Sequence, residues 1–240
     1  MKKYCLTLTI IIFLFCSSVF ADTKNLVFNE SYDFRNIDSI TISLTYENLK
    51  ISQIYGDEIV VEIGSNNIKK IPQVTLDDEM EYEDSFKNLE IKSTVKKALP
   101  GTSCTVYLYL PQDFLPDRMN ISLVSGNLQA ENLRSQNALY ISNVSGRTDI
   151  ASSSTDFLKL TSISGNVTMQ KLSAGYFDMN NVSGNIFVEL ENSILAKSYI
   201  TTVSGKIQVY YKKNESPFLD DSPDFIISSV SGKIETKPFD

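Results

Sequence analysis

Apolar and polar residues alternate in a repeated pattern through the C-terminal half of the chain. The tripeptide Val/Ile-Ser-Gly occurs six times, with glycines spaced 20, 19, 19, 21 and 27 residues apart. The positions seven, five and two before each glycine, and two and four after it, are apolar in 27 of 30 cases. Alternation with a period of two predicts β-strands with one buried and one solvated face. The repeated pairs are Ser125-Gly126, Ser145-Gly146, Ser164-Gly165, Ser183-Gly184, Ser204-Gly205 and Ser231-Gly232.

The alternation changes phase between the positions five and two residues before each glycine. Small polar residues such as Ser142 and Asn143 fill this gap. Such side chains bond nearby backbone, so the phase break predicts a corner, after which the Val/Ile of the tripeptide should point into the core. Each unit is therefore expected to form strand, corner, strand and turn, which is the size of one β-solenoid rung. Six rungs stacked about 4.8 Å apart would form a rod of roughly 29 Å.

We interpret the Ser-Gly pairs as structural. Glycine permits a positive φ or the close approach of another backbone. The serines should face outward and form a ladder in which each hydroxyl bonds its neighbour. A row of nucleophiles is the alternative, but the chain contains no His that could act as their base. The Gly-x-Ser-x-Gly elbow of hydrolases is also missing from every copy.

Three segments are expected along the chain. Residues 1–21 have a basic start, an apolar run and Val19-x-Ala21, the pattern of a cleaved signal peptide. Residues 22–115 should form irregular β rungs that cap the rod, and residues 116–240 the solenoid of six Ser-Gly rungs. The predicted fold is thus an all-β, single-stranded β-helix or β-solenoid with an N-terminal cap. Strand signals in the cap lie at residues 40–44, 49–51, 59–63, 74–76, 89–95 and 105–110.

Composition narrows the possible functions. The formal net charge is -7, which gives no electrostatic basis for binding nucleic acid or anionic lipid. There is no His, so His-based triads and His metal sites are excluded. Cys104 is the one cysteine beyond the signal segment, and its parity with Val106 and Leu108 predicts a buried core thiol. No second apolar span follows the signal, so we expect an exported chain that is not an integral membrane protein.

Two segments are candidates for contacts with ligands. Residues 77–84 carry six carboxylates, which would suit Ca²⁺ but are typical of a solvated acidic loop, and this choice stays open. The long spacing before the sixth rung contains an insertion with Pro217, Phe218 and Leu219, which we predict to be a contact loop. Tyr107 and Tyr109 have outward parity and could form an aromatic strip unless neighbours cover them. No cofactor is expected.

The six Val-Ser-Gly copies, each followed by Asn, Lys or Arg and an aliphatic residue, resemble the bacterial "putative adhesin" families of β-strand repeats. The segment Val-Tyr-Leu-Tyr-Leu-Pro at 106–111 resembles the strand that precedes their first Ser-Gly rung. The resemblance covers about residues 30–240. It implies a β-solenoid, an envelope-associated role and no catalytic residue. The family's usual Asp after Ser-Gly is here Asn or a basic residue, which weakens any metal site on this face.

These observations favour an exported, non-catalytic protein of the cell envelope or surface, with a role in binding, adhesion or envelope sensing. Its ligand, whether protein, peptide or glycan, is not identified by the sequence. One alternative is a polysaccharide-active β-helix enzyme, which would need paired carboxylates among the outward Asp149, Asp178 and Glu235. Another is a structural rod that self-associates through its open solenoid end, where an edge strand could pair with another chain.

Overall fold

A computed structural model describes residues 25–68, 71–81, 84–95, 101–191, 198–212 and 225–239. The predicted signal peptide at 1–21 lies outside these ranges. Within them the chain is almost entirely β, and its one helical element is the 3-10 turn Phe34–Asn36. The prediction of an all-β solenoid built from rungs of about 20 residues is confirmed.

Seventeen strands follow one another in the described residues. They are β1 (Leu26–Asp33), β2 (Ser39–Leu44), β3 (Asn48–Ile54), β4 (Glu58–Ser65), β5 (Gln73–Glu81), β6 (Asp84–Lys92), β7 (Cys104–Pro111), β8 (Arg118–Leu123), β9 (Leu128–Ala130), β10 (Leu133–Arg134), β11 (Ala138–Ser145), β12 (Thr148–Ile150), β13 (Ser153–Ser164), β14 (Val167–Ser183), β15 (Ile186–Leu190), β16 (Ser198–Lys212) and β17 (Phe225–Phe239).

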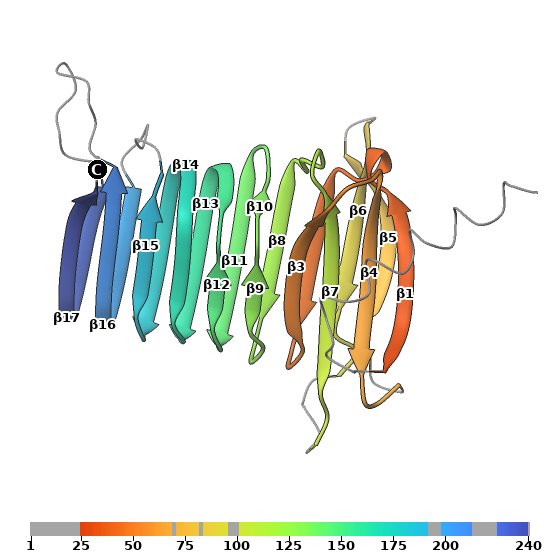
Figure 1. The fold of residues 1–240 in the computed structure, drawn as a ribbon, viewed down its shortest axis with the longest axis horizontal. Coiled ribbons are helices and arrows are strands. Elements are labelled where there is room, and N and C mark those ends of the chain that lie inside the picture. Colours follow the sequence, from red (N-terminus) through yellow and green to blue (C-terminus); the bar gives the residue numbers. More distant parts are fainter. Residues whose placement is uncertain are drawn as a thin grey trace, which may run out of the picture.

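The rod has two main faces of parallel strands, with every rung contributing one strand segment to each (Figure 1). A short third stack joins β10, the first residues of β13 and the middle of β14. The first face stacks β8, β11, β13, the C-terminal part of β14, and the N-terminal parts of β16 and β17. The second stacks β9, β12, the N-terminal part of β14, β15, and the C-terminal parts of β16 and β17. Equivalent residues of successive rungs are direct neighbours, as Met119, Leu139, Leu158 and Phe177 show.

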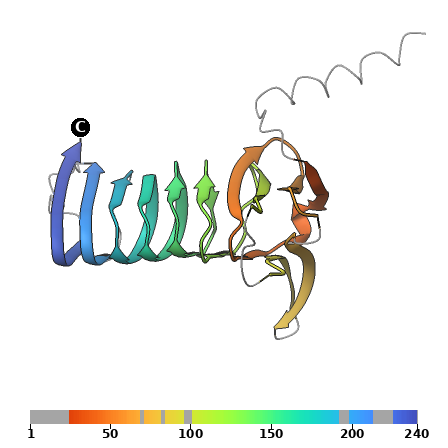
Figure 2. The ribbon, with the colours of Figure 1, turned by 90° about the horizontal axis from the view of Figure 1, so that it is seen from below.

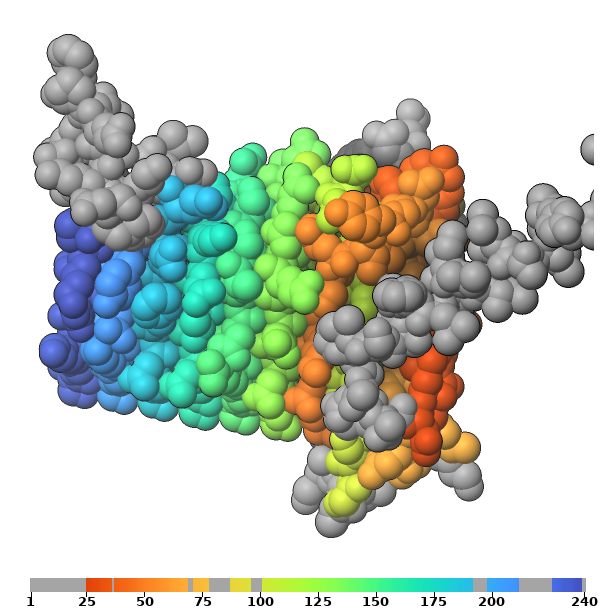
Figure 3. All heavy atoms as spheres, in the orientation of Figure 1, coloured from red at the N-terminus to blue at the C-terminus, as the bar shows by residue number. Residues whose placement is uncertain are grey.

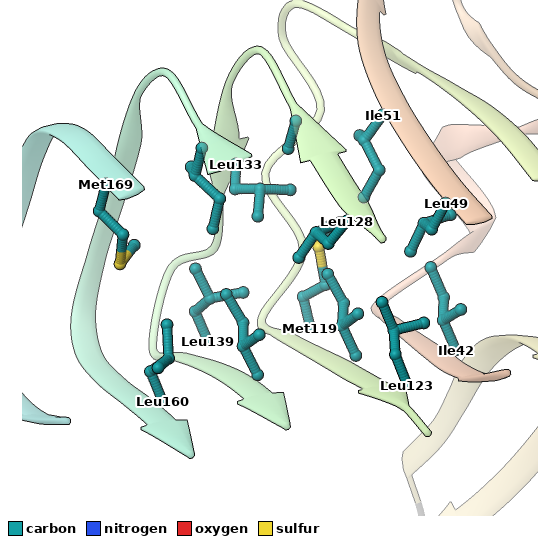
Figure 4. Close-up of a cluster of buried hydrophobic side chains, with 14 of the residues drawn as sticks. Ile42, Leu49, Ile51, Met119, Leu123, Leu128, Leu133, Leu139, Leu160 and Met169 are labelled. Atoms are coloured by element: carbon teal, nitrogen blue, oxygen red, sulfur yellow. The ribbon is translucent and has the colours of Figure 1, made fainter. Parts of the chain in front are cut away.

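Apolar side chains from both faces fill the space between them. Figure 4 shows Leu139, Leu160, Leu133 and Met169 pointing into this space from neighbouring rungs. All four are buried, and so are the apolar residues in register with them in the rungs before β16. In the last rung the corresponding Ile227 is only partly buried and Thr236 is exposed. Because each column repeats along the rod, every rung covers the apolar surface of the next, which a single rung could not bury alone.

The N-terminal region continues the same two faces. Strands β2 and β3 stack in parallel on β8 and β9, so this pair acts as a rung ahead of the first Ser-Gly corner. Beyond it, β6 and then antiparallel β5 extend the first face. Strand β7, followed by antiparallel β4 and β1, extends the second. Figure 2 shows that this region is broader than the rod. The division at residue 116 stays a prediction, since in-register stacking runs across it.

Glu47 joins the cap to the first rungs and is fully buried. One carboxylate oxygen, Oε2, accepts the backbone N–H groups of Thr45 and Tyr46, each at 2.9 Å. The other, Oε1, accepts the hydroxyl of Ser93, which follows β6, at 2.7 Å. A buried carboxylate requires such partners, because an unpaired charge in an apolar interior is costly.

Cys104 is buried, as predicted. Burial raises the pKa of its thiol to about 11, and the nearby Glu47 carboxylate adds to this effect, while a hydrogen bond with Ser65 opposes it. A thiol with such a pKa holds very little thiolate at neutral pH, so Cys104 has the properties of a core residue rather than a nucleophile.

The predicted inward orientation of the Val/Ile before each Ser-Gly is wrong. These side chains point to solvent, and Ile163 for example is 46% exposed. The side chain one residue earlier points inward instead. This position is occupied by the buried residues Asn143, Ser162, Asn181 and Thr202. The strand alternation therefore continues one residue further than expected, and the phase breaks at the Ser-Gly pair itself.

The reason is the hydrogen bonding of the corner backbone. Asn181 Nδ2 donates to the carbonyl of Gly184 at 3.1 Å, and Thr202 Oγ1 donates to that of Ser204 at 3.0 Å. Carbonyls at a bend lack a full set of strand partners, and leaving them unsatisfied inside costs more than exposing a valine. A polar side chain thus takes the inward place at the corner and the aliphatic one is left outside.

Replacing Leu160 with Ala should destabilise the protein by about 2–5 kcal/mol, because it opens a cavity in a filled column. Leu160 is 1% exposed. The matched change Ile163→Ala, three residues away in the same rung, should cost less than about 0.5 kcal/mol because that side chain is solvent-facing. Urea unfolding followed by circular dichroism measures both. Equal losses for the two variants would contradict the assigned orientation.

Candidate binding surfaces

The Ser-Gly corners lie directly above one another and leave no room for a side chain at glycine. A Cβ added at Gly165 would lie 2.0 Å from the carbonyl oxygen of Gly146, and one added at Gly205 would lie 1.9 Å from that of Gly184. The same holds at all six corners, where the distances range from 1.9 to 2.3 Å. Real Cβ atoms do not approach backbone this closely, so the rung spacing itself requires glycine.

The serine hydroxyls bond backbone rather than one another. Ser145 Oγ donates to the carbonyl of Val124 at 3.3 Å, and Ser164 Oγ to that of Val144 at 3.4 Å. The same bond recurs at all six corners, from each serine to the rung before it. The expected hydroxyl-to-hydroxyl ladder is therefore replaced by serine-to-carbonyl bonds. These hydroxyls are engaged in joining rungs.

A second ladder, not predicted from the sequence, follows the corner. Asn127 Oδ1 accepts the backbone N–H of Arg147 at 2.8 Å. Asn166 and Asn185 accept in the same way from the residue one rung further on. The sequence feature that could have predicted this ladder is the Asn that directly follows Ser-Gly in three of the six copies. At this position an amide oxygen can accept a hydrogen bond from the next rung.

The exposed Val/Ile residues form one continuous line along the rod, which we call the aliphatic ridge. Each rung contributes one residue to the ridge. Because successive rungs stack in register, these side chains lie next to one another along the corner. The members, all of them exposed, are Val124, Val144, Ile163, Val182, Val203 and Val230.

Four rings line the outer side of the first face, and we call this line the aromatic row. Tyr140 meets Phe157 edge to face at 5.7 Å, and Phe157 stacks on Tyr176 at 5.2 Å with 12° between the ring planes. Tyr176 then meets Tyr199 edge to face at 6.4 Å. Each ring precedes or follows an inward core residue, so none belongs to the core. Lys159 and Asp178 lie beside the row on the same face.

The outer side of the second face is mainly polar. A shallow hollow of about 330 Å³ is lined by residues of three successive rungs, among them Gln129, Asp149 and Thr168. Two rings, Phe187 and Tyr210, lie 5.3 Å apart further along this face. In Figure 3 the successive rungs appear as side-by-side bands that end in β17.

The three outward carboxylates are not brought together. Asp149 Oδ2 lies 2.5 Å from Nε of Arg147, and Asp178 accepts a hydrogen bond from Asn180 at 2.8 Å. Glu235 pairs with Lys206 at 3.3 Å and with Lys237 at 2.7 Å. Asp149 and Glu235 share a column but are four rungs apart, about 19 Å at strand spacing. Asp178 lies on the other face. The separation of about 5–9.5 Å that glycoside hydrolysis needs is not met by this arrangement.

Other predicted contact residues are either partnered or undescribed. The Tyr109 hydroxyl donates to Glu62 at 3.2 Å, and Lys50 Nζ lies 5.7 Å from the Tyr107 ring centre, so both tyrosines have neighbours on the second face. Pro217, Phe218 and Leu219 lie outside the described residues. The acidic segment 77–84 falls at the tip of the β5–β6 hairpin and is described only in part.

Within the described ranges, no group of three or more Cys, Asp or Glu side chains is placed to hold a metal ion. The same part of the chain has no helix long and apolar enough to span a membrane.

Comparison with known families matches residues 37–234 to the Toastrack DUF4097 model. The chain belongs to this family. The match covers both the Toastrack solenoid and most of its cap, which agrees with the continuous stacking across residue 116. No curated protein of significant similarity was found.

One solved structure supports the same fold, and a second shows a weaker similarity. A "putative adhesin" from Bacteroides fragilis NCTC 9343 is 19% identical, with 88% of this chain and 96% of that chain covered and a TM-score of 0.51. A "putative cell adhesion protein" from Clostridium sporogenes ATCC 15579 is 14% identical, with 88% and 99% covered and a TM-score of 0.48. At 19% identity, the similarity to the Bacteroides structure concerns the Toastrack fold alone.

Replacing Gly165 with Ala should destabilise the rod by on the order of 3 kcal/mol, because the new Cβ would overlap the Gly146 carbonyl. Gly101→Ala is the control. Gly101 has a φ of +75°, but a Cβ there would meet nothing within 4 Å, so only backbone strain of about 1 kcal/mol is expected. Thermal and urea melts measure both. The corner account is wrong if Gly165→Ala is no more damaging than Gly101→Ala.

Glu235 should titrate far below an ordinary glutamate. Hydrogen bonds from Lys237 and Lys206 lower its pKa to about 2. A pKa lowered by folding stabilises the folded state above the ordinary value of about 4.3, and this contribution is lost as the pH falls towards 2. Carboxyl carbon shifts in an NMR titration report the pKa. Lys237→Ala should raise the pKa, whereas Lys233→Ala should leave it unchanged, and an ordinary pKa in the unaltered protein would contradict the pairing.

Proposed function

We propose that this protein is an exported, non-catalytic protein of the cell envelope or surface that binds its ligand along the side of the rod. Within this class, adhesion is the role we favour over envelope sensing. The names of the structural relatives, adhesin and cell adhesion protein, accord with a binding role. Export rests on the signal-like pattern of residues 1–21.

The observation that carries the proposal is the aromatic row. Four rings occupy outward positions on successive rungs, where they contribute nothing to the core between the two faces. Aromatic side chains bury large areas on binding with little loss of rotamer freedom, and they are enriched among residues that dominate interfaces. Their repetition at rung spacing offers an extended ligand several contacts in line, next to the charges of Lys159 and Asp178.

An enzymatic role is supported less well. Each of the three carboxylates considered for catalysis, Asp149, Asp178 and Glu235, is engaged by its own neighbour. The pKa of Glu235 is lowered to about 2, which does not suit a general acid. Each corner serine hydroxyl already donates to a carbonyl. A binding function uses the rod as it stands, whereas catalysis would require these groups to be rearranged.

A separate observation favours a second candidate, a structural rod that self-associates. Among the strands that the structure describes, β17 pairs only with β16 and has one long edge without a strand partner. Unprotected strand edges are sites of pairing between chains.

The test of ligand binding uses beads coated with the mature protein on surfaces carrying mucin, collagen or purified peptidoglycan. At least one surface should retain the beads, and the triple variant Tyr140→Ala, Tyr176→Ala, Tyr199→Ala should reduce retention at least about tenfold, since interface aromatics carry much of the binding energy. Val182→Ala on the aliphatic ridge is the matched control and should retain binding.

Two results would contradict the proposal. One is equal retention by the unaltered protein and the triple variant on every surface. The other is turnover of glycosides or esters by the purified protein that a single substitution abolishes. Circular dichroism melts establish that all variants are folded before they are compared.

A further inference from the structure

The last rung presents its core to solvent in the described residues. Ile234 is 42% exposed, whereas Ile207, its neighbour at the same place in the preceding rung, is fully buried. Val230 is 82% exposed, far more than the other members of the aliphatic ridge. Strand β17, of 15 residues, thus combines exposed apolar side chains at the end of the rod with an edge that no described strand pairs with.

The shape of this end restricts what can cover it. Strand β17 runs through the Ser231-Gly232 corner and pairs with β16 on both faces, so its free edge is bent. A straight strand could follow only one half of it. At the other end of the molecule the outermost strands, β1 and β5, are separate segments with antiparallel neighbours and do not form one bent rung. A bent edge therefore matches another bent edge, and β17 is the one that the described chain leaves open.

The orientation pattern of β17 is symmetric about its corner. In register with the inner rungs, inward places fall at 225, 227 and 229 before the Ser231–Gly232 bond, and at 234, 236 and 238 after it. The inward positions therefore form pairs at equal distances from this bond, namely 229 with 234, 227 with 236, and 225 with 238. A second copy turned by 180° about an axis through the corner would then run antiparallel and present inward positions to inward positions.

We propose that two molecules join end to end through their β17 strands as a two-fold symmetric dimer. In this register Ile227 lies opposite Thr236 of the second copy, and Ser229 opposite Ile234. The outward positions pair Val230 with Lys233, Ser228 with Glu235, and Ile226 with Lys237 of the other chain. No like charges oppose each other, which an antiparallel pair requires.

The proposed dimer does not depend on the proposed binding function, but it would strengthen binding. A double rod carries two aromatic rows, one from each copy, and so can engage a repetitive surface at two points. Binding through two linked sites increases avidity without any new contact at either site.

Light scattering coupled to size-exclusion chromatography tests the dimer, using two variants that place a positive or a negative charge at position 230. Val230 lies opposite Lys233 of the second copy, so Val230→Lys should raise the dimer Kd at least about tenfold, counting both symmetric pairs. Val230→Glu should keep or lower it. Val182→Lys, the same substitution on an inner rung of the ridge, should leave it unchanged.

Hydrogen exchange of the β17 amides provides the second readout. These amides should be protected in the dimer and exchange faster in Val230→Lys under the same conditions. A monomeric unaltered protein, equal effects of Val230→Lys and Val230→Glu, or protection of β17 in a monomer by the chain's own residues 213–224 would each overturn the proposal. The triple aromatic variant should still dimerise, which separates this outcome from failure of the ligand-binding test.

Discussion

The whole structure depends on the close approach of backbones at the Ser-Gly corners. Each of the last five corner glycines sits on the carbonyl of the glycine one rung earlier, and Gly126 sits on that of Glu47, at distances that exclude a Cβ. This contact sets the corner of every rung directly above the last. Once the corners are aligned, the strands on both faces meet in register, the inward side chains form columns, and the serine and asparagine ladders can bridge from rung to rung.

As a consequence of this construction, the polar side chains at the corners are occupied by hydrogen bonds to the backbone. The serine hydroxyls, which in another setting could act as nucleophiles, are donors to carbonyls of the neighbouring rung. The asparagines next to them serve the backbone as well. What stays available for ligands is the outer side of each face, where the aromatic row and the polar second face differ in character. The faces thus carry the proposed binding function, while the proposed dimer uses the edge of β17 that no described strand pairs with.

The sequence predicts much of this fold, because strand periodicity is strict and the glycine spacing marks each rung. The orientation at the corner could not be read in the same way. Asn143 and Val144 are adjacent, so one of them must face inward, and hydrophobicity alone favours the valine. Satisfying backbone carbonyls at a bend outweighs that preference, and only Leu123, an apolar residue at the place occupied by Asn143 in the next rung, gave a hint of it. The buried Glu47 was missed because nothing local distinguishes it from a solvated glutamate, and the aromatic row because its rings come from different offsets in their rungs.

Distances between spin labels along the aliphatic ridge test the aligned stack most directly. Nitroxides on cysteines introduced at Val124 and Val230, in protein diluted with unlabelled chain, should lie about 24 Å apart, five strand spacings. Moving the first label to Val144 should shorten the distance by about one spacing, to about 19 Å, with narrow distributions in both cases. Distances that do not change by one spacing per rung, or broad distributions for both pairs, would contradict a rod held in register by its glycine corners.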